Sequence, residues 1–94
     1  MTTNPLEVLD RGAAELAEVA TERHQYELAL RAWRAIVSGS DGSPVLRATA
    51  YARQARIAQV QGDTPRAVFL AKRARAESPE VCEAADLLGE LGVG

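Results

Sequence analysis

The spacing of alanine and the other apolar residues most constrains what this chain can fold into. These residues recur every three or four positions, which is the periodicity of one face of an α-helix. Apolar residues make up 47% of the chain and aromatic residues only 4%, so the core is built mainly from small side chains. Alanine favours helices because it loses no side-chain entropy there. The 94 residues are therefore expected to form a single all-α domain.

Helix-start signals divide the chain into five helical stretches. A capping residue followed by proline, which is favoured at the first helical position, occurs at Asn4-Pro5, Ser43-Pro44, Thr64-Pro65 and Ser78-Pro79. The expected helices run from 5 to about 22, from 26 to 38–39, from 44 to about 61, from 64 onward and from 79 onward. Residues 39–43 form the one clear linker, and the short connections leave no room for a sheet.

The helical stretches repeat. A shift of 38 residues superimposes small residues on small residues, pairing Ala17 with Ala55, Ala20 with Ala58 and Ala29 with Ala67. A further shift of 34 residues pairs Ala50 with Ala84. The unit thus recurs a third time before residue 94. The first shift is longer than the second because the linker of residues 39–43 lies between the first two units.

The middle unit resembles the tetratricopeptide repeat. It reads Tyr51-x2-Gln54-Ala55-x2-Ala58, followed by Gly62-Asp63, Ala67 and a closing Pro79 at the family's spacing. Gln54 stands where the family prefers leucine. The resemblance implies about two and a half helix-hairpin units in a short right-handed solenoid. Residues 10–43 form the first unit with its linker, 48–81 the second, and 82–94 a half repeat or capping helix.

The resemblance implies a non-catalytic adaptor or chaperone-like module that binds a peptide or helix of another protein. Such ligands lie in the concave groove formed by the first helix of each hairpin. The residues expected to line this groove are Arg11, Glu18, Thr49, Arg56, Gln59, Glu83, Asp86 and Glu90. Acidic residues at one end of the groove would favour a basic or polar segment, although they also suit a polar cap on the last helix.

Two other functions remain open. A homo-oligomeric scaffold would pair copies through the last helix, using Val81, Leu87, Leu88, Leu91 and Val93. A weaker alternative is nucleic-acid binding through the convex face, using Arg31, Arg34, Arg66, Lys72 and Arg73. The pI of about 5.4 argues against the latter. Charge is also segregated, because residues 31–75 are basic while both flanking segments are acidic, and this can favour internal pairing, head-to-tail association or an anionic partner.

Catalytic and metal-binding patterns are not evident in the sequence. His24 and Cys82 are the only residues of their kind, so no Cys/His nucleophile pair or zinc motif is apparent. His24 is expected in a polar turn, Cys82 in helix packing, and Trp33 and Tyr26 in the core, whereas the position of Phe69 is unsettled. We expect no enzyme activity and no cofactor. The sequence shows neither a leader nor an apolar run of roughly 18 residues, so a cytoplasmic location is expected by default.

Overall fold

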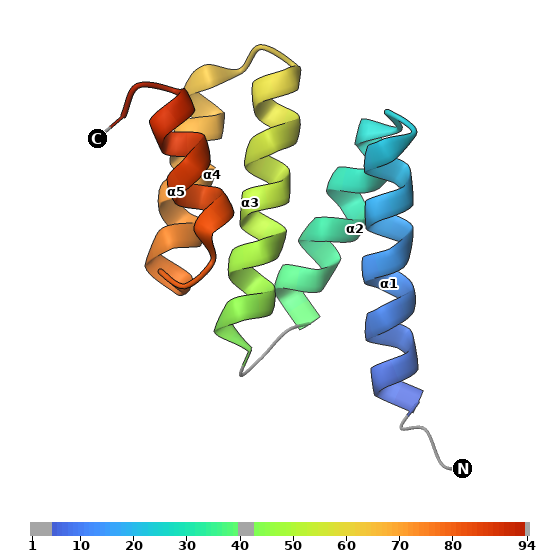
Figure 1. The fold of residues 1–94 in the computed structure, drawn as a ribbon. Helices are drawn as coiled ribbons and strands as arrows, with labels where there is room; N and C mark the ends of the chain where they lie inside the picture. Colours follow the sequence, from blue (N-terminus) through green and yellow to red (C-terminus); the bar gives the residue numbers. More distant parts are fainter. Residues whose placement is uncertain (1–4, 40–42, 94) are drawn as a thin grey trace.

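The chain folds into five helices and, within the described residues 5–39 and 43–93, no strand, as a computed structural model shows. For residues 5–13 the description covers the backbone alone. The all-α prediction is confirmed. Successive helices run in opposite directions, so α1, α3 and α5 point one way and α2 and α4 the other (Figure 1). The helices are α1 Pro5–Glu22, α2 Tyr26–Gly39, α3 Pro44–Val60, α4 Thr64–Glu77 and α5 Cys82–Glu90.

Two of the expected helix starts have side-chain caps. The Ser43 hydroxyl accepts a hydrogen bond from the backbone N–H of Leu46 at 3.4 Å, and Pro44 begins α3. For α4 the cap is Asp63, one residue earlier than Thr64, because its carboxylate accepts from the N–H of Arg66 at 3.2 Å. The expected cap Asn4 and linker residues 40–42 lie outside the described residues.

The Ser78-Pro79 signal does not start α5, so that prediction was wrong. Ser78 is extended, as a residue before proline tends to be, and its N–H donates to the carbonyl of Ala74 at 3.0 Å to close α4. A turn follows, in which the N–H of Val81 donates to the carbonyl of Ser78 at 3.2 Å. α5 then begins at Cys82 without a side-chain cap.

The helices α1, α3 and α5 end in the same backbone conformation. Each is followed by a residue with positive φ: His24 at 60°, Gly62 at 81° and Gly92 at 76°. The next N–H then donates back to a carbonyl five residues earlier, and these bonds are Gln25 to Ala20, Asp63 to Ala58 and Val93 to Leu88. This is the arrangement of a Schellman motif. His24 is exposed in its turn, as expected.

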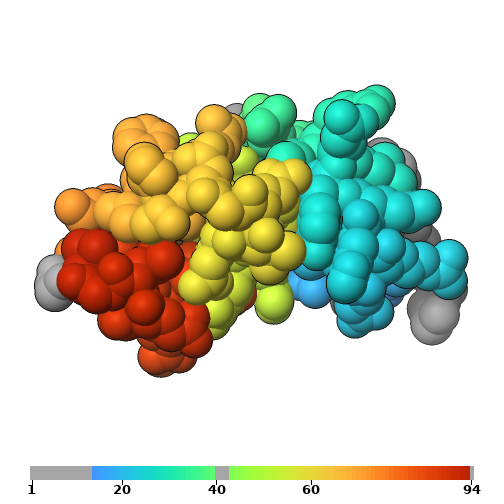
Figure 2. Space-filling model, turned by 90° about the horizontal axis from the view of Figure 1, so that it is seen from above, coloured from blue at the N-terminus to red at the C-terminus, as the bar shows by residue number. Residues whose placement is uncertain are grey.

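The core lies on both sides of α3. One side places Ala50 and Ile57 against α1 and α2, in a cluster centred on the buried Trp33. The other side places Ala55 and Ala58 against α4 and α5, and a smaller cluster adds Ala48, Ala52, Ala74 and Ala84. The molecule is elongated, 48 × 27 × 18 Å, with α1 and α2 at one end and α4 and α5 at the other (Figure 2).

Most core expectations hold, and two do not. Trp33 is buried, and Tyr26 is half-buried against the same cluster and stacks on His24 with ring centroids 5.6 Å apart. In α5 the apolar spacing predicts an inward face of Val81, Ala84, Ala85, Leu88 and Leu91, but Ala85 is exposed and Leu87 is buried in its place. Cys82 is exposed as the first residue of α5, so its expected packing role was wrong.

The backbone conformation at position 62 requires glycine, and Gly89 provides a control position without that requirement. A methyl group at either position would meet no atom within 4 Å, but only Gly62 has a positive φ. We expect Gly62→Ala to lower the free energy of unfolding by about 1 kcal/mol, because an L-residue is disfavoured there. Gly89→Ala, in a helical conformation, is expected to be neutral or slightly stabilising. Urea unfolding of both variants measures this, and equal effects would contradict it.

Gln54 is a buried polar residue, and replacing it tests how its side-chain amide affects stability. It is 3% exposed, and among the described residues only Arg53 Nε is a fully buried side-chain polar atom without a hydrogen-bond partner. An apolar side chain at this site avoids the cost of desolvating an amide, so Gln54→Leu is expected to raise the free energy of unfolding by about 1 kcal/mol. The exposed Gln61→Leu serves as control and is expected to change it by less than about 0.5 kcal/mol. A loss of stability in Gln54→Leu would show that the amide is satisfied.

Candidate functional site

The helices that run in the same direction, α1, α3 and α5, share one polar face. α3 packs against α5, and side-chain ion pairs reach from α3 to both α1 and α5. Most of the α3 surface is covered by the two sides of the core, which leaves one open strip. The side chains on that strip are Thr49, Arg53, Arg56 and Gln59.

Two arginines on this strip are paired with three carboxylates. The Nε atom of Arg53 lies 3.3 Å from a carboxylate oxygen of Glu18 on α1 and 3.5 Å from one of Glu83 on α5. Arg56 has its Nε atom 3.8 Å from the other oxygen of Glu83, and its Nη1 atom donates to Glu90. Arg53 thus connects α1, α3 and α5, and Glu83 lies between both arginines. We call these five residues the groove network.

Arg53 is held by charge more than by directed hydrogen bonding. Its Nε atom is buried and, although two carboxylates lie within ion-pair distance, neither is placed to accept a hydrogen bond from it. Arg56 differs, because its Nη1 atom donates to the side-chain oxygen of Gln59 at 3.3 Å as well as to Glu90. The Arg53 charge is therefore compensated while the hydrogen-bonding capacity of its Nε atom is unused.

Five of the eight residues expected in the groove come together. Glu18, Arg56, Gln59, Glu83 and Glu90 all take part in the contacts just described or lie beside them. Thr49 is half-buried and donates to the carbonyl of Val45 in its own helix at 2.8 Å. Asp86 is exposed on α5 and joins none of these pairs. The Arg11 side chain lies outside the described residues.

Arg53 was missed by the sequence prediction, although the sequence carried a signal for it. It follows Thr49 by four residues and precedes Arg56 by three, so all three share one side of a helix. The structure shows that Arg53, and not Arg56, is the residue that reaches α1. The face bears three carboxylates and two guanidinium groups, all partly open to solvent, which suits recognition of a polar or charged segment.

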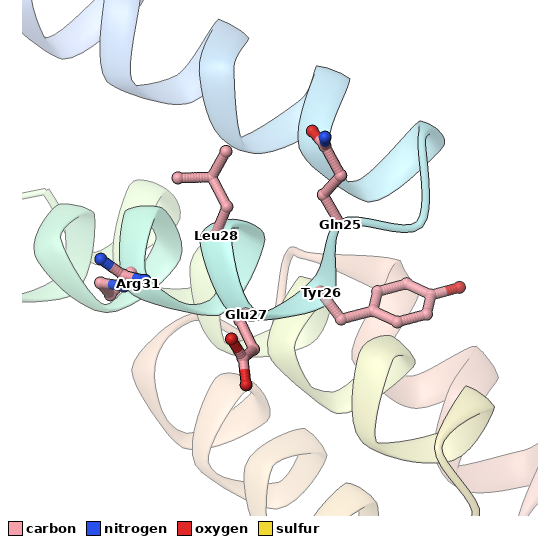
Figure 3. A pocket seen from close by; sticks show the side chains of 5 residues that line it. All are labelled: Gln25, Tyr26, Glu27, Leu28 and Arg31. Carbon is pink, nitrogen blue, oxygen red and sulfur yellow. The ribbon is translucent and has the colours of Figure 1, made fainter.

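The remaining described surface offers other features. A shallow hollow of about 350 Å³ surrounds the first turn of α2 (Figure 3), lined by Gln25, Tyr26, Glu27, Leu28 and Arg31. The basic residues of α2 and α4 that were expected to face outward are exposed, namely Arg31, Arg34, Arg66, Lys72 and Arg73. Within the described residues, no three His, Cys, Asp or Glu side chains could jointly hold a metal ion. In the same part of the chain, no helix has the length and apolar character to cross a membrane.

Comparisons with family models, curated proteins and solved structures return no match to this chain. The resemblance to the tetratricopeptide repeat therefore stays an interpretation of the sequence pattern.

The groove network can be tested by a double-mutant cycle on Glu18 and Arg53. We expect Glu18→Gln and Arg53→Gln to show a coupling of about 0.5–1 kcal/mol in urea unfolding, because the pair is partly buried and belongs to a network. The coupling should fall by at least about half in 1 M NaCl, where charges are screened within roughly 3 Å.

A matched cycle uses Glu15, which is exposed one turn earlier on α1 and is not paired with Arg53. Glu15→Gln with Arg53→Gln is expected to show no coupling. Equal coupling in both cycles, or a Glu18 coupling unchanged by salt, would contradict the ion pair as the link between α1 and α3.

Proposed function

We propose that this chain is a non-catalytic protein-interaction module of tetratricopeptide-like architecture that binds a segment of another protein across the face of α1, α3 and α5. The observation that supports this most directly is the groove network, which collects charged side chains from three helices on one partly open surface. Repeated helix ends at His24, Gly62 and Gly92 are consistent with the repeat interpretation. A cytoplasmic location and the absence of a cofactor belong to the same proposal.

The network favours a basic or polar partner segment. Its three carboxylates outnumber its two arginines, and Asp86 adds a further exposed carboxylate on α5. A lysine or arginine of the partner can take the place of an arginine beside Glu83 or Glu90, so that binding exchanges one ion pair for another. Such exchange gives specificity for charge pattern more than high affinity, and micromolar dissociation constants are expected.

The oligomeric alternative through α5 is less well supported. Leu87 and Leu88 are buried against α3 and α4, and Leu91 and Val93 pack against the same cluster. Val81 packs against the small alanine cluster. Leu87 and Leu88 already serve the chain's own core, so a second copy could reach them only by displacing that core, and the other three side chains are half-buried.

The proposed groove is tested by selecting binders from a random 12-residue peptide library and mapping the best peptide by NMR chemical shifts on the labelled protein. We expect enrichment of Lys and Arg, with shift changes centred on Glu18, Arg53, Arg56 and Glu83. Glu83→Gln combined with Glu90→Gln should weaken binding at least about tenfold, because two carboxylates facing the ligand are lost.

The matched control removes the same charge elsewhere, with Glu27→Gln on α2 combined with Glu80→Gln in the turn before α5, both of which are exposed and outside the groove network. This variant is expected to bind as the wild type does. Shift changes confined to α2 and α4, or equal weakening by both double variants, would contradict the groove as the binding surface. A library that yields no enriched sequence would contradict a peptide-binding function.

A further inference from the structure

Two exposed apolar surfaces lie outside the groove, and the first is on α4. Phe69 is 65% exposed and points away from the buried side of its helix, which carries Ala67, Leu70, Ala71 and Ala74. Arg66 and Lys72 lie three residues before and after it, and Arg73 lies four residues after it, so all three share its side of the helix. We call these four residues the α4 patch. An exposed aromatic ring within a set of cations is typical of a contact surface.

The cations of the α4 patch are poorly compensated, in contrast to those of the groove network. Within the described residues, Arg66 and Lys72 form no ion pair through their side chains. Arg73 has one long contact, 3.9 Å to Glu77, and lies over the Tyr51 ring at 5.5 Å. Glu77 itself lies closer to Arg47, at 3.0 Å. The patch therefore carries positive charge that a partner's carboxylates can neutralise.

The second surface is at the opposite end of the molecule, on α1 and α2. Leu16 and Val19 are 49% and 42% exposed, and Leu28 is 38% exposed. Leu16 and Val19 lie three residues apart on α1 and so share one side of that helix. Leu28 points from α2 toward α1 in Figure 3, and α1 carries the other two side chains. We call these three residues the α1–α2 patch.

The α1–α2 patch has carboxylates and a hollow beside it. Glu15, Glu22 and Glu27 are exposed and none forms an ion pair with a described residue, although Arg23 and Arg31 are exposed nearby. Leu28 also lines the hollow of about 350 Å³ at the start of α2, together with Glu27 and Arg31. A hollow of this size accommodates groups larger than one aromatic ring, and Arg31 can pack on such a ring.

We propose that the two patches bind each other between copies of this chain, with Phe69 of one copy seated beside Leu28 of the next. The patches cannot meet within one chain, because they lie at opposite ends of a molecule 48 Å long (Figures 1 and 2). Apolar side chains meet apolar side chains, and the cations of the α4 patch meet the carboxylates around the α1–α2 patch. The contact joins different surfaces, so it is head-to-tail and can continue from copy to copy.

This association is independent of the groove and leaves the groove network open. It uses neither the α5 leucines, which are buried, nor the side chains of the groove network. The patches are small compared with stable interfaces, so a weak association is expected, with a dissociation constant on the order of 100 μM. It should weaken with salt, because the charges around both patches are exposed.

Sedimentation velocity on the full chain tests the proposal. Protein concentrations from about 10 μM to 1 mM bracket the expected dissociation constant. Measurements in about 50 mM and about 500 mM NaCl compare weak with strong screening of the charges. The average mass is expected to rise with concentration at low salt, and less at high salt. Two variants each remove one patch: Phe69→Ser, and Leu16→Ser combined with Val19→Ser. Each alone is expected to remain monomeric.

An equimolar mixture of these two variants is the decisive measurement. Each retains the patch that the other lacks, so the mixture should form dimers of one copy of each variant and nothing larger. Val45→Ser, which removes a half-exposed valine at the start of α3, is the control and should associate as the wild type does. Circular dichroism and urea unfolding confirm that the variants fold, as expected for exposed positions.

Three results would overturn the proposal: a wild type that stays monomeric over the whole concentration range at low salt, association that survives Phe69→Ser, or a mixture of variants that stays monomeric. The double variant of Glu83 and Glu90 separates this proposal from the proposed function. This variant should lose peptide binding and keep self-association. The peptide-binding function and the self-association can therefore each be disproved without affecting the test of the other.

Discussion

The close packing of α3 against neighbours on two sides is the constraint on which the rest of the structure depends. Alanines at its buried positions allow α2 to approach one side and α4 and α5 the other. Larger side chains there would separate the helices and open cavities, because protein interiors are close-packed. The large residues Trp33, Ile57, Leu87 and Leu88 then fill the spaces that remain. A core of this kind tolerates little change in side-chain volume on α3.

The same packing explains where the charged residues of α3 lie. With two sides of the helix buried, only the strip that carries Arg53 and Arg56 stays open, between α1 and α5. Long arginine side chains can lie along this strip and reach a carboxylate on either neighbour. Glu18 and Glu83 are placed by their own helices, so the groove network follows from helix packing and from the register of three helices. It adds a polar connection between α1 and α5, which are separated by α3.

Sequence periodicity predicted much of the fold, and its errors have physical causes. The five helices and the buried Trp33 follow from apolar spacing and capping signals, which act locally. The Ser78-Pro79 pair was misread because an extended residue before proline can end one helix as well as precede another. In α5, a face with Ala84 and Leu88 can include either Ala85 or Leu87, and only the rotation of the helix against α3 and α4 buries Leu87. Arg53 was missed because the expected groove was taken from a family pattern, whereas contact with Glu18 depends on the distance between α1 and α3.

The arginines of the groove network and those of the α4 patch differ in how their charge is compensated. This difference distinguishes how a partner would bind at each surface. Arg53 and Arg56 are already surrounded by carboxylates, so a ligand at the groove must replace an existing ion pair and gains only the difference between two similar interactions. Arg66 and Lys72 are paired with no carboxylate of the described residues, so acidic groups that approach the α4 patch add interactions without displacing one of these. Phe69 adds apolar area that water would otherwise cover. Under the two proposals, the groove would therefore select among charge patterns, and the α4 patch would provide weak, salt-sensitive attachment.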